Sequence, residues 1–217
     1  GLSMANFNGS MLSPYQQLLP TRPEVFSFNQ MWNEACGGDD SCSVGFHPFL
    51  QRFYLRNANY RKFKFSHLYT LDSDPKIKHA GTYEGKSGKS GNVTDEQAYQ
   101  NVIDEVKTNA QADKPAQFIE LVTMQNHAPY PGIYGDENEF FAADASNVPD
   151  GEKGVIGNYA KGVQRTDAAT KQFLDELDAI DEPITVVFYG DHLPGIYTTA
   201  ANDPKNSLAL HETDYFI

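Results

Sequence analysis

The most distinctive hydrophobic pattern is a short apolar run, ITVVFY at residues 184–189, which lies just before Gly190. Apolar and polar positions hardly alternate in it, so it predicts a strand buried on both faces, as in the middle of a largely parallel sheet. Asp191 and His192 follow at the carboxyl end of this strand, where open α/β sheets bind ligands. An Asp and a His suit a divalent metal such as zinc or manganese, and an Asx-type turn explains the pair equally well.

Two further strand-like segments also end next to a histidine. Residues 118–124 (FIELVTM) form a strong strand candidate, and the tripeptide after them ends in His127. Residues 44–46 (VGF) run into His47, and Pro48, which cannot donate to a ladder, is expected to end that strand.

Three other segments have apolar residues at helical spacing. The first, residues 25–35, is followed by a Gly-Gly pair that ends it. Thr94 and Gln97 form a capping box that starts a helix of about three turns. The third helix is predicted at residues 154–180, between the last two strands.

A strand, a helix and another strand in this order form a βαβ unit, so the last two strands are predicted to be parallel neighbours. If the strand at residues 44–46 joins the same sheet, then His47, His127, His192 and Asp191 all lie along one edge. One histidine at a strand end is usually structural, whereas three indicate a polyanion or metal site. Such a site suits phosphoryl or sulfuryl transfer, in which charge on equatorial oxygens must be stabilised.

Composition limits the class of partner. The 217 residues are 40% hydrophobic, enough for one large domain with a sizeable core. A net charge of −12 argues against nucleic acid as a partner and against a basic membrane-binding patch. No run approaches the ~18 apolar residues of a membrane span. Cys36 and Cys42 could close a small disulfide loop in an extracellular protein, which we favour, or be two thiols in the cytosol.

Two polar segments are ambiguous. Residues 49–71 combine aromatic and basic side chains, which indicates either an anion site or a solvated face over packed aromatic rings. Residues 80–92 contain two Gly-Lys-Ser triplets, but neither has the glycine spacing of a phosphate-binding P-loop. We therefore interpret residues 80–92 as a mobile surface loop.

Three motifs resemble one known family. VTMQNHAPY at residues 122–130 and FYGDH at 188–192 are similar to motifs of the lipoteichoic acid synthases. GFHP at 45–48, followed by FYLRN at 53–57 and Tyr60, resembles a third. These are sulfatase-like phosphoglycerol transferases of the alkaline phosphatase superfamily in Gram-positive bacteria.

The resemblance implies an α/β fold, a three-layer α/β/α sandwich around a mainly parallel sheet, with residues 1–217 forming a single catalytic domain truncated at both ends. Asp191 and His192 would be metal ligands, with manganese the expected divalent ion. His127 would contact the glycerol phosphate, and His47 and Arg56 would line the headgroup pocket.

The resemblance also implies a substrate and a location. The donor would be phosphatidylglycerol and the acceptor a glycerol phosphate polymer of the lipoteichoic acid type or a glycolipid. The enzyme would act on the extracellular face of the bacterial cell membrane, anchored only by spans outside this chain.

The sequence departs from the family at several positions. Tyr54 stands where the synthases carry a Trp, which keeps an aromatic wall, and Phe49 stands where they often carry an Asp, which removes a polar contact. The family's nucleophilic Thr motif is not found, and neither is a further metal-binding Glu. We therefore assign no catalytic residue, expect the Thr upstream of Gly1, and expect this fragment to bind metal weakly and to be inactive.

Two alternatives stay open. The protein could be a sulfatase or phosphodiesterase-type hydrolase of the same superfamily, although the Cys/Ser-x-Pro-x-Arg motif of sulfatases proper is not found. It could also be a non-catalytic surface module that binds anionic glycans.

Overall fold

The sheet at the centre of the molecule has three parallel strands. The computed structural model describes residues 21–23, 27–38, 42–84, 90–129, 133–134, 138–141 and 147–217. β1 (Ser43–Phe46) lies between β2 (His67–Tyr69) and β5 (Phe118–Leu121), and both pairings are parallel. All four residues of β1 are buried, as expected for a central strand covered on both faces. The strands predicted at 44–46 and 118–124 are confirmed, although the second ends at Leu121.

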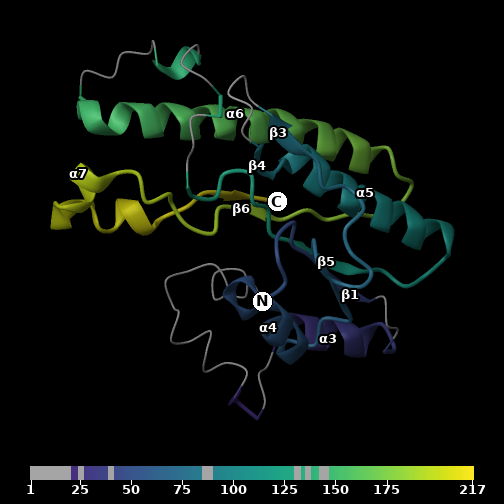
Figure 1. Cartoon of the computed structure of the whole chain (residues 1–217). Coiled ribbons are helices and arrows are strands. Elements are labelled where there is room, and N and C mark those ends of the chain that lie inside the picture. The colour runs from purple at the N-terminus through teal and green to yellow at the C-terminus, as the bar shows by residue number, and fades with distance from the viewer. Residues whose placement is uncertain are drawn as a thin grey trace.

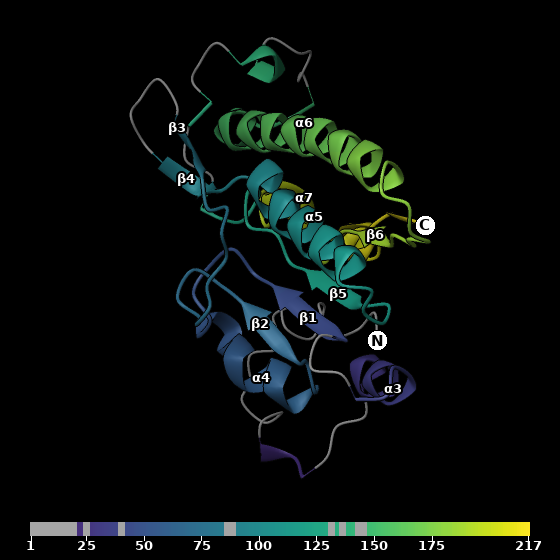
Figure 2. The same cartoon turned by 90° about the vertical axis from the view of Figure 1, so that its right-hand side faces the viewer.

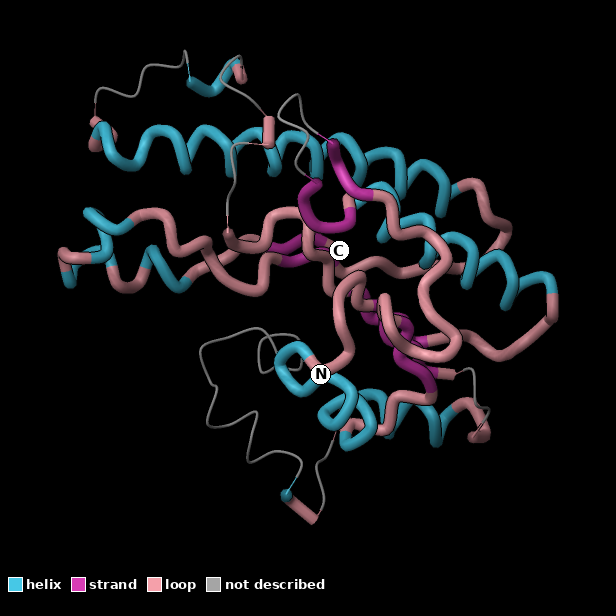
Figure 3. Tube along the Cα trace, in the orientation of Figure 1, coloured by secondary structure: helices cyan, strands magenta, loops and turns pink. Residues whose placement is uncertain are grey.

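Helices cover both faces of this sheet and give three α/β/α layers (Figure 1, Figure 2). α3 (Phe28–Ala35) and α4 (Arg56–Lys62) lie on one side, and α5 (Asp95–Gln111) and α6 (Asp150–Asp178) lie on the other. The predicted α/β class and layered architecture are therefore confirmed. The other elements are short and are joined by long loops (Figure 3): η2 (Phe53–Leu55), β3 (Thr82–Glu84), β4 (Ser90–Val93), η3 (Glu139–Phe141), β6 (Phe188–Tyr189), α7 (Thr198–Ala201), η4 (Pro204–Asn206), η5 (Ala209–His211) and β7 (Tyr215–Phe216).

Apolar side chains pack the sheet against α5 and α6. Val44 and Phe46 are two residues apart on β1, so both side chains point to the same face, where they form a buried cluster with Val102 of α5. Phe173 of α6 packs on this cluster and stacks on Tyr99, with ring centroids 4.6 Å apart. α6 therefore contributes to the core although it lies outside α5.

The other face of the sheet is packed by the ring of one tyrosine. Tyr60 of α4 is 1% exposed and forms a buried cluster with Phe63 and Phe65. A Cβ atom on Gly45 would come within 2.6 Å of Cε1 of Tyr60. The central strand thus needs a glycine at this position, because any side chain would displace the ring that anchors α4.

The predicted helices form with shifted bounds. α3 begins after the N-cap Ser27, and Val25, which the prediction included, lies outside the described residues. α6 begins four residues earlier than predicted, at Asp150. α5 has 17 residues, more than the predicted three turns. Only half of the capping box at its start is formed: Thr94 accepts from the backbone N–H of Gln97, whose side chain instead accepts from Gly81.

The prediction for residues 184–189 is wrong in two respects. Only Phe188–Tyr189 form a strand, and the partner of this strand within the described chain is the antiparallel β7, so β6 does not belong to the parallel sheet. The run is also not buried on both faces, since Thr185 is exposed and Val187 is 41% exposed. Only one side of the run is covered by the rest of the molecule. The sequence did not show this, because apolar residues also occupy exposed positions such as Val187.

Two further expectations are settled. Cys36 and Cys42 form a disulfide bond, as we favoured. The segment at residues 80–92 was predicted as a mobile surface loop, but its two arms are β3 and β4, which pair antiparallel. The residues between them, 85–89, lie outside the described part of the chain.

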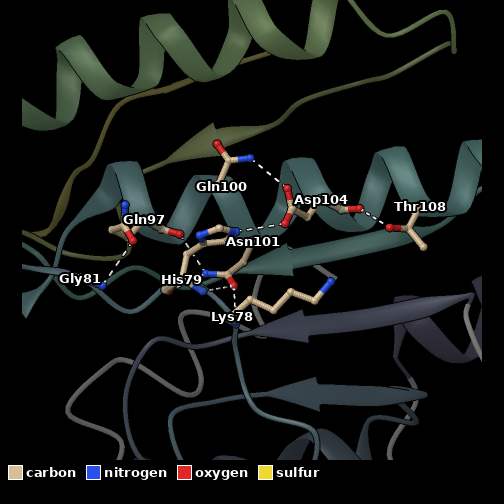
Figure 4. Close-up of polar contacts among 8 residues, drawn as sticks. All are labelled: Lys78, His79, Gly81, Gln97, Gln100, Asn101, Asp104 and Thr108. Atoms are coloured by element: carbon tan, nitrogen blue, oxygen red, sulfur yellow. Dashed lines mark hydrogen bonds and ion pairs between the residues drawn. The ribbon is translucent and has the colours of Figure 1, made fainter.

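A buried asparagine fastens the segment before β3 to α5 (Figure 4). Oδ1 of Asn101 accepts hydrogen bonds from the backbone N–H groups of Lys78, at 2.9 Å, and His79, at 3.0 Å. Nδ2 of Asn101 donates to the carbonyl oxygens of His79 and Gln97, both at 2.8 Å. Because Asn101 is only 5% exposed, water cannot easily replace these bonds.

We predict that Asn101→Ala lowers the free energy of unfolding by about 3 kcal/mol, because it leaves two backbone N–H groups without an acceptor. Urea unfolding measures the change. Gln100→Ala on the same helix is the matched control, since the side chain of Gln100 bonds only that of the partly exposed Asp104 among the described residues. This control variant should cost less than about 0.5 kcal/mol. Equal losses in both variants would contradict the role given to Asn101.

Candidate functional site

Two of the three predicted histidines lie close together at the carboxyl ends of β1 and β5. His47 follows β1 directly and is fully buried, and His127 lies in the turn after β5. The ring of Phe53 lies between them: it is nearly parallel to His47, with centroids 6.3 Å apart, and edge-on to His127 at 5.5 Å. Phe53 was not among the predicted site residues, although it falls inside the aromatic and basic segment.

Both imidazole rings have the same tautomer. Nδ1 of His47 lies 3.2 Å from the carbonyl oxygen of Val122, and Nδ1 of His127 lies 2.6 Å from that of Ala128. A carbonyl oxygen can only accept, so each Nδ1 carries the hydrogen and each Nε2 has a lone pair when the ring is neutral. Nε2 of His47 is buried and has no hydrogen-bond partner among the described residues.

His47 is held neutral by its surroundings. Burial lowers its pKa from 6.5 to about 3, and the positive charge of Arg56 acts in the same direction. The hydrogen bond to Val122 opposes these effects. At neutral pH, His47 therefore offers a bare nitrogen rather than a positive charge.

Arg56 is buried next to a strained segment. The two residues before it, Tyr54 and Leu55, have φ values of 53° and 54°, in the left-handed region that side chains other than glycine rarely adopt. The guanidinium of Arg56 is 5.9 Å from the centroid of the Tyr54 ring, and Arg56 is 2% exposed. Its Nε and Nη1 atoms have no hydrogen-bond partner among the described residues, so two donors remain for an anion.

Glu120 of β5 belongs to the same neighbourhood, and the sequence prediction missed it. Glu120 is in register with Gly45, which places its side chain on the face that carries Tyr60. Burial raises the pKa of Glu120 to about 7, while Arg56 lowers it and so opposes burial. The signal for Glu120 was present, because a single carboxylate inside the apolar run FIELVTM is unusual.

Asp191 and His192 lie in the turn after β6. Their side chains are 41% and 51% exposed, and Nε2 of His192 is 3.7 Å from Oδ2 of Asp191. Oδ1 of Asp191 accepts from the backbone N–H of His192, a local bond of the kind expected for a turn. Within the described residues, no hydrogen bond, ion pair or ring contact joins this pair to His47 or His127.

The pair fits half of a divalent metal site. Nδ1 of His192 contacts the carbonyl oxygen of Leu193 at 2.8 Å, so its Nε2 lone pair is available beside the Asp191 carboxylate. The described residues contain no group of three or more His, Cys, Asp or Glu side chains that could hold an ion. A stable ion here would therefore need ligands besides these two.

A second network, also missed by the prediction, fixes the turn that carries His127. Nδ2 of Asn126 donates to Oγ1 of Thr166 at 2.8 Å, and Thr166 donates to Oδ2 of Asp95 at 2.5 Å. Gln125 bonds the same hydroxyl at 3.1 Å. Burial raises the pKa of Asp95 to about 6, and the hydrogen bond from Thr166 opposes this. The turn is thus tied to both α5 and α6.

The layered fold around a parallel sheet is that of a sulfatase-like α/β domain. The chain belongs to the sulfatase family, whose model matches residues 1–217.

Solved structures support this assignment. The chain is similar to the phosphoglycerol transferase GacH of Streptococcus pyogenes, solved with sn-glycerol-1-phosphate: the TM-score is 0.70, the sequence identity is 26%, and 100% of this chain and 54% of GacH are covered. The fold is also that of the lipoteichoic acid synthase LtaP from Listeria monocytogenes, with a TM-score of 0.61, 18% identity, and 95% of this chain and 46% of LtaP covered. The predicted resemblance to this class of proteins is confirmed.

Two curated relatives come from Rhizobium meliloti. One, named for cyclic beta-1,2-glucan modification, is 27% identical, and the matched region covers 85% of this chain and 26% of that relative. The other, the capsular polysaccharide biosynthesis protein RkpI, is 29% identical and covers 79% of this chain and 26% of its own length. The chain thus spans about a quarter of these relatives. No helix within the described residues is long and apolar enough to cross a membrane.

We predict that His47 makes stability depend on pH. Its pKa is about 3 when folded and 6.5 when unfolded, so the unfolded chain binds more protons between these values. Stability from this group is therefore complete above pH 6.5 and is lost as the pH falls towards 3. Relative to His47→Gln, the wild-type chain should lose about 2 kcal/mol between about pH 7.5 and about pH 5.

Urea unfolding of both proteins at the two pH values measures this difference. Asp95 and Glu120, whose raised pKa values act with the opposite sign, are present in both proteins and cancel. An identical pH dependence in the two proteins would show that His47 titrates normally in the folded state.

Proposed function

We propose that the whole protein is a phosphoglycerol transferase that moves glycerol phosphate from phosphatidylglycerol to a lipoteichoic-acid-type polymer or glycolipid. Residues 1–217 would form part of its single catalytic domain. The observation that carries the proposal is the grouping of His47 and His127 around Phe53 at the sheet edge, with the positive charge of Arg56 close enough to act on His47. The histidines lie at the carboxyl ends of parallel strands, where α/β sheets bind ligands. All of this chain is covered by its structural similarity to GacH.

In this proposal each site residue contacts a different part of the phosphatidylglycerol headgroup. Arg56 supplies the positive charge for the phosphate, through the Nε and Nη1 donors that have no partner in the described part of the chain. Tyr54 forms the aromatic wall beside the guanidinium. His47 and His127 contact the glycerol phosphate through Nε2, since Nδ1 of each ring is already engaged.

Asp191 and His192 would hold a divalent ion, taken as manganese, together with ligands from outside the described residues. When bound, this ion would neutralise charge on the phosphoryl oxygens. The nucleophilic Thr is likewise proposed to lie outside this chain, upstream of Gly1. This fragment alone would then bind metal weakly and be inactive.

The extracellular face of the cell membrane is the proposed location, in a Gram-positive bacterium and with membrane anchoring by segments outside this chain. The Cys36–Cys42 disulfide supports an oxidising compartment, because such bonds are rare in the cytosol. Nucleic acid is not proposed as a partner, since a net charge of −12 disfavours it.

A glycan is a second candidate for the acceptor. Both curated relatives are named for polysaccharides, one for a cyclic glucan and one for capsular polysaccharide. Glycerol phosphate would still come from phosphatidylglycerol in that case. Because the chain belongs to the sulfatase family, a hydrolase of this family is a further candidate.

We predict that the full-length protein releases diacylglycerol from phosphatidylglycerol when manganese is added. Asp191→Asn should lower this rate by about 100-fold or more, because it removes one of few metal ligands. Asp181→Asn, an exposed acid before β6, is the matched control and should leave the rate unchanged. If the wild type releases no diacylglycerol but cleaves aryl phosphodiesters or sulfate esters, the protein is a hydrolase and not a transferase.

We also predict that Arg56→Lys lowers kcat/KM for phosphatidylglycerol by about 10- to 100-fold, because an ammonium group cannot reproduce the two-pronged guanidinium contact. Arg52→Lys is the control: Arg52 is exposed and lies four residues earlier. Initial rates over a range of lipid concentrations measure both variants. An unchanged kcat/KM in Arg56→Lys would exclude Arg56 from the headgroup site.

A further inference from the structure

The hydroxyl group of Thr166 on α6 takes part in three hydrogen bonds to residues that are distant in the sequence. It donates to Oδ2 of Asp95, the first residue of α5, at 2.5 Å. It accepts from Nδ2 of Asn126 at 2.8 Å and from Nε2 of Gln125 at 3.1 Å. A hydroxyl has one hydrogen and two lone pairs, so these three bonds use its full capacity.

The carboxylate of Asp95 sets the direction of these bonds. Asp95 is 1% exposed, and burial raises its pKa only to about 6, so the carboxyl group is mostly ionised at neutral pH. An ionised carboxylate can only accept, so the hydroxyl hydrogen of Thr166 points towards it and both lone pairs face the amides. If the Asn126 amide were turned over, its Oδ1 would face those lone pairs with no hydrogen in between. One orientation of the Asn126 side chain is therefore favoured.

A glycine on α6 leaves room for the Asn126 amide. A Cβ atom on Gly162 would lie 2.3 Å from Oδ1 of Asn126, which cannot swing away without losing its bond to Thr166. The carbonyl oxygen of Gly162 also accepts from Nε2 of Gln125, at 3.2 Å. One turn of α6 therefore holds both of the amides that precede His127.

His127 itself has few contacts that hold it. Its ring is edge-on to Phe53, its Nδ1 bonds the carbonyl oxygen of Ala128, and its backbone N–H donates to the carbonyl oxygen of Met124 at 3.0 Å. Within the described residues, no hydrogen bond joins its imidazole to another element of the fold. The place of the imidazole thus depends on the turn, and the turn depends on the two amides before it.

We propose that Thr166 is the positioning residue for His127: its hydroxyl holds the two amides before His127 and so sets where the imidazole lies at the sheet edge. The inference rests on the proposed function in one respect, namely that His127 contacts the glycerol phosphate. It adds a residue of α6 that acts on the headgroup only through His127.

Thr166→Val in the full-length protein tests this role, because valine has nearly the same shape as threonine but no hydroxyl. Hydrogen exchange of the peptide at residues 124–129, measured by mass spectrometry, should become about tenfold faster, since two amides lose their acceptor. The kcat/KM for phosphatidylglycerol should fall by about 10- to 100-fold, because the imidazole is misplaced. Thr166→Ser keeps the hydroxyl and should restore both values to within about twofold.

Thr170→Val is the matched control. Thr170 lies one turn further along α6, and its hydroxyl also bonds a residue of α5, the phenol of Tyr99, at 2.9 Å. This bond joins the two helices and does not involve the turn after β5, so its loss should lower stability without changing the exchange at residues 124–129 or kcat/KM. Equal effects in Thr166→Val and Thr170→Val would overturn the positioning role.

Gly162→Ala is a second variant, which decides the matter if Thr166→Val does not fold. It displaces the Asn126 amide but keeps the Thr166 hydroxyl, and alanine favours a helix interior. Exchange at residues 124–129 should again rise. Gly154→Ala, whose Cβ would meet no atom within 4 Å beyond its own helix backbone, should leave the exchange unchanged. The same exchange in both glycine variants would count against the proposal.

Hydrogen exchange also separates this proposal from the proposed function. If the wild type releases no diacylglycerol, the proposed function fails, while faster exchange in Thr166→Val but not in Thr170→Val still supports the positioning of His127. If the exchange rises in Thr166→Val and kcat/KM does not change, the transferase stands and the positioning role is overturned.

Discussion

The burial of one cation, Arg56, sets the constraints on the rest of this site. A charged group with 2% exposure is costly unless anions or oriented dipoles surround it. The described chain supplies a carboxylate, Glu120, on the neighbouring strand and a phenol, Tyr60, on the same helix. Tyr60 reaches this position only because Gly45 leaves room for its ring. The glycine in the central strand, the helix packed on it and the buried charge therefore form one interdependent unit.

Burial and the charge of Arg56 act together on the pKa of His47 but against each other on the pKa of Glu120. Burial and Arg56 both lower the pKa of His47, so this ring stays neutral, whereas burial raises and Arg56 lowers the pKa of Glu120, which comes to about 7. For Glu120 burial outweighs the nearby cation, so the carboxyl group compensates Arg56 only in part at neutral pH. Part of the positive charge of the Arg56 guanidinium is thus left without a balancing negative charge, and a bound phosphate would supply one.

Local signals predicted much of this arrangement. The strand endings at His47 and His127 followed from short apolar runs and a proline, and their convergence needed only that both strands be parallel in one sheet. The roles of Phe53 and of the Asp95–Thr166 contact could not be predicted, because each acts through residues distant in sequence. Glu120 was marked by its place in an apolar run, but its proximity to Arg56 was not visible in the sequence. The prediction for residues 184–189 was wrong because an apolar composition does not show which face of a strand other elements cover.

The position of Asp191 and His192 depends on the last residues of the chain rather than on the parallel sheet. The backbone N–H of Gly190 donates to the carbonyl oxygen of Asp214 at 3.3 Å, and Thr213 donates to the carbonyl of Gly190 at 2.7 Å. Phe188 stacks on Phe216 with ring centroids 5.0 Å apart. Burial raises the pKa of Tyr189, and the nearby Glu120 carboxylate raises it further, so β6 lies within electrostatic range of β5. Glu120 is thus a charge near both Arg56 of α4 and Tyr189 of β6, two elements that are far apart in the sequence.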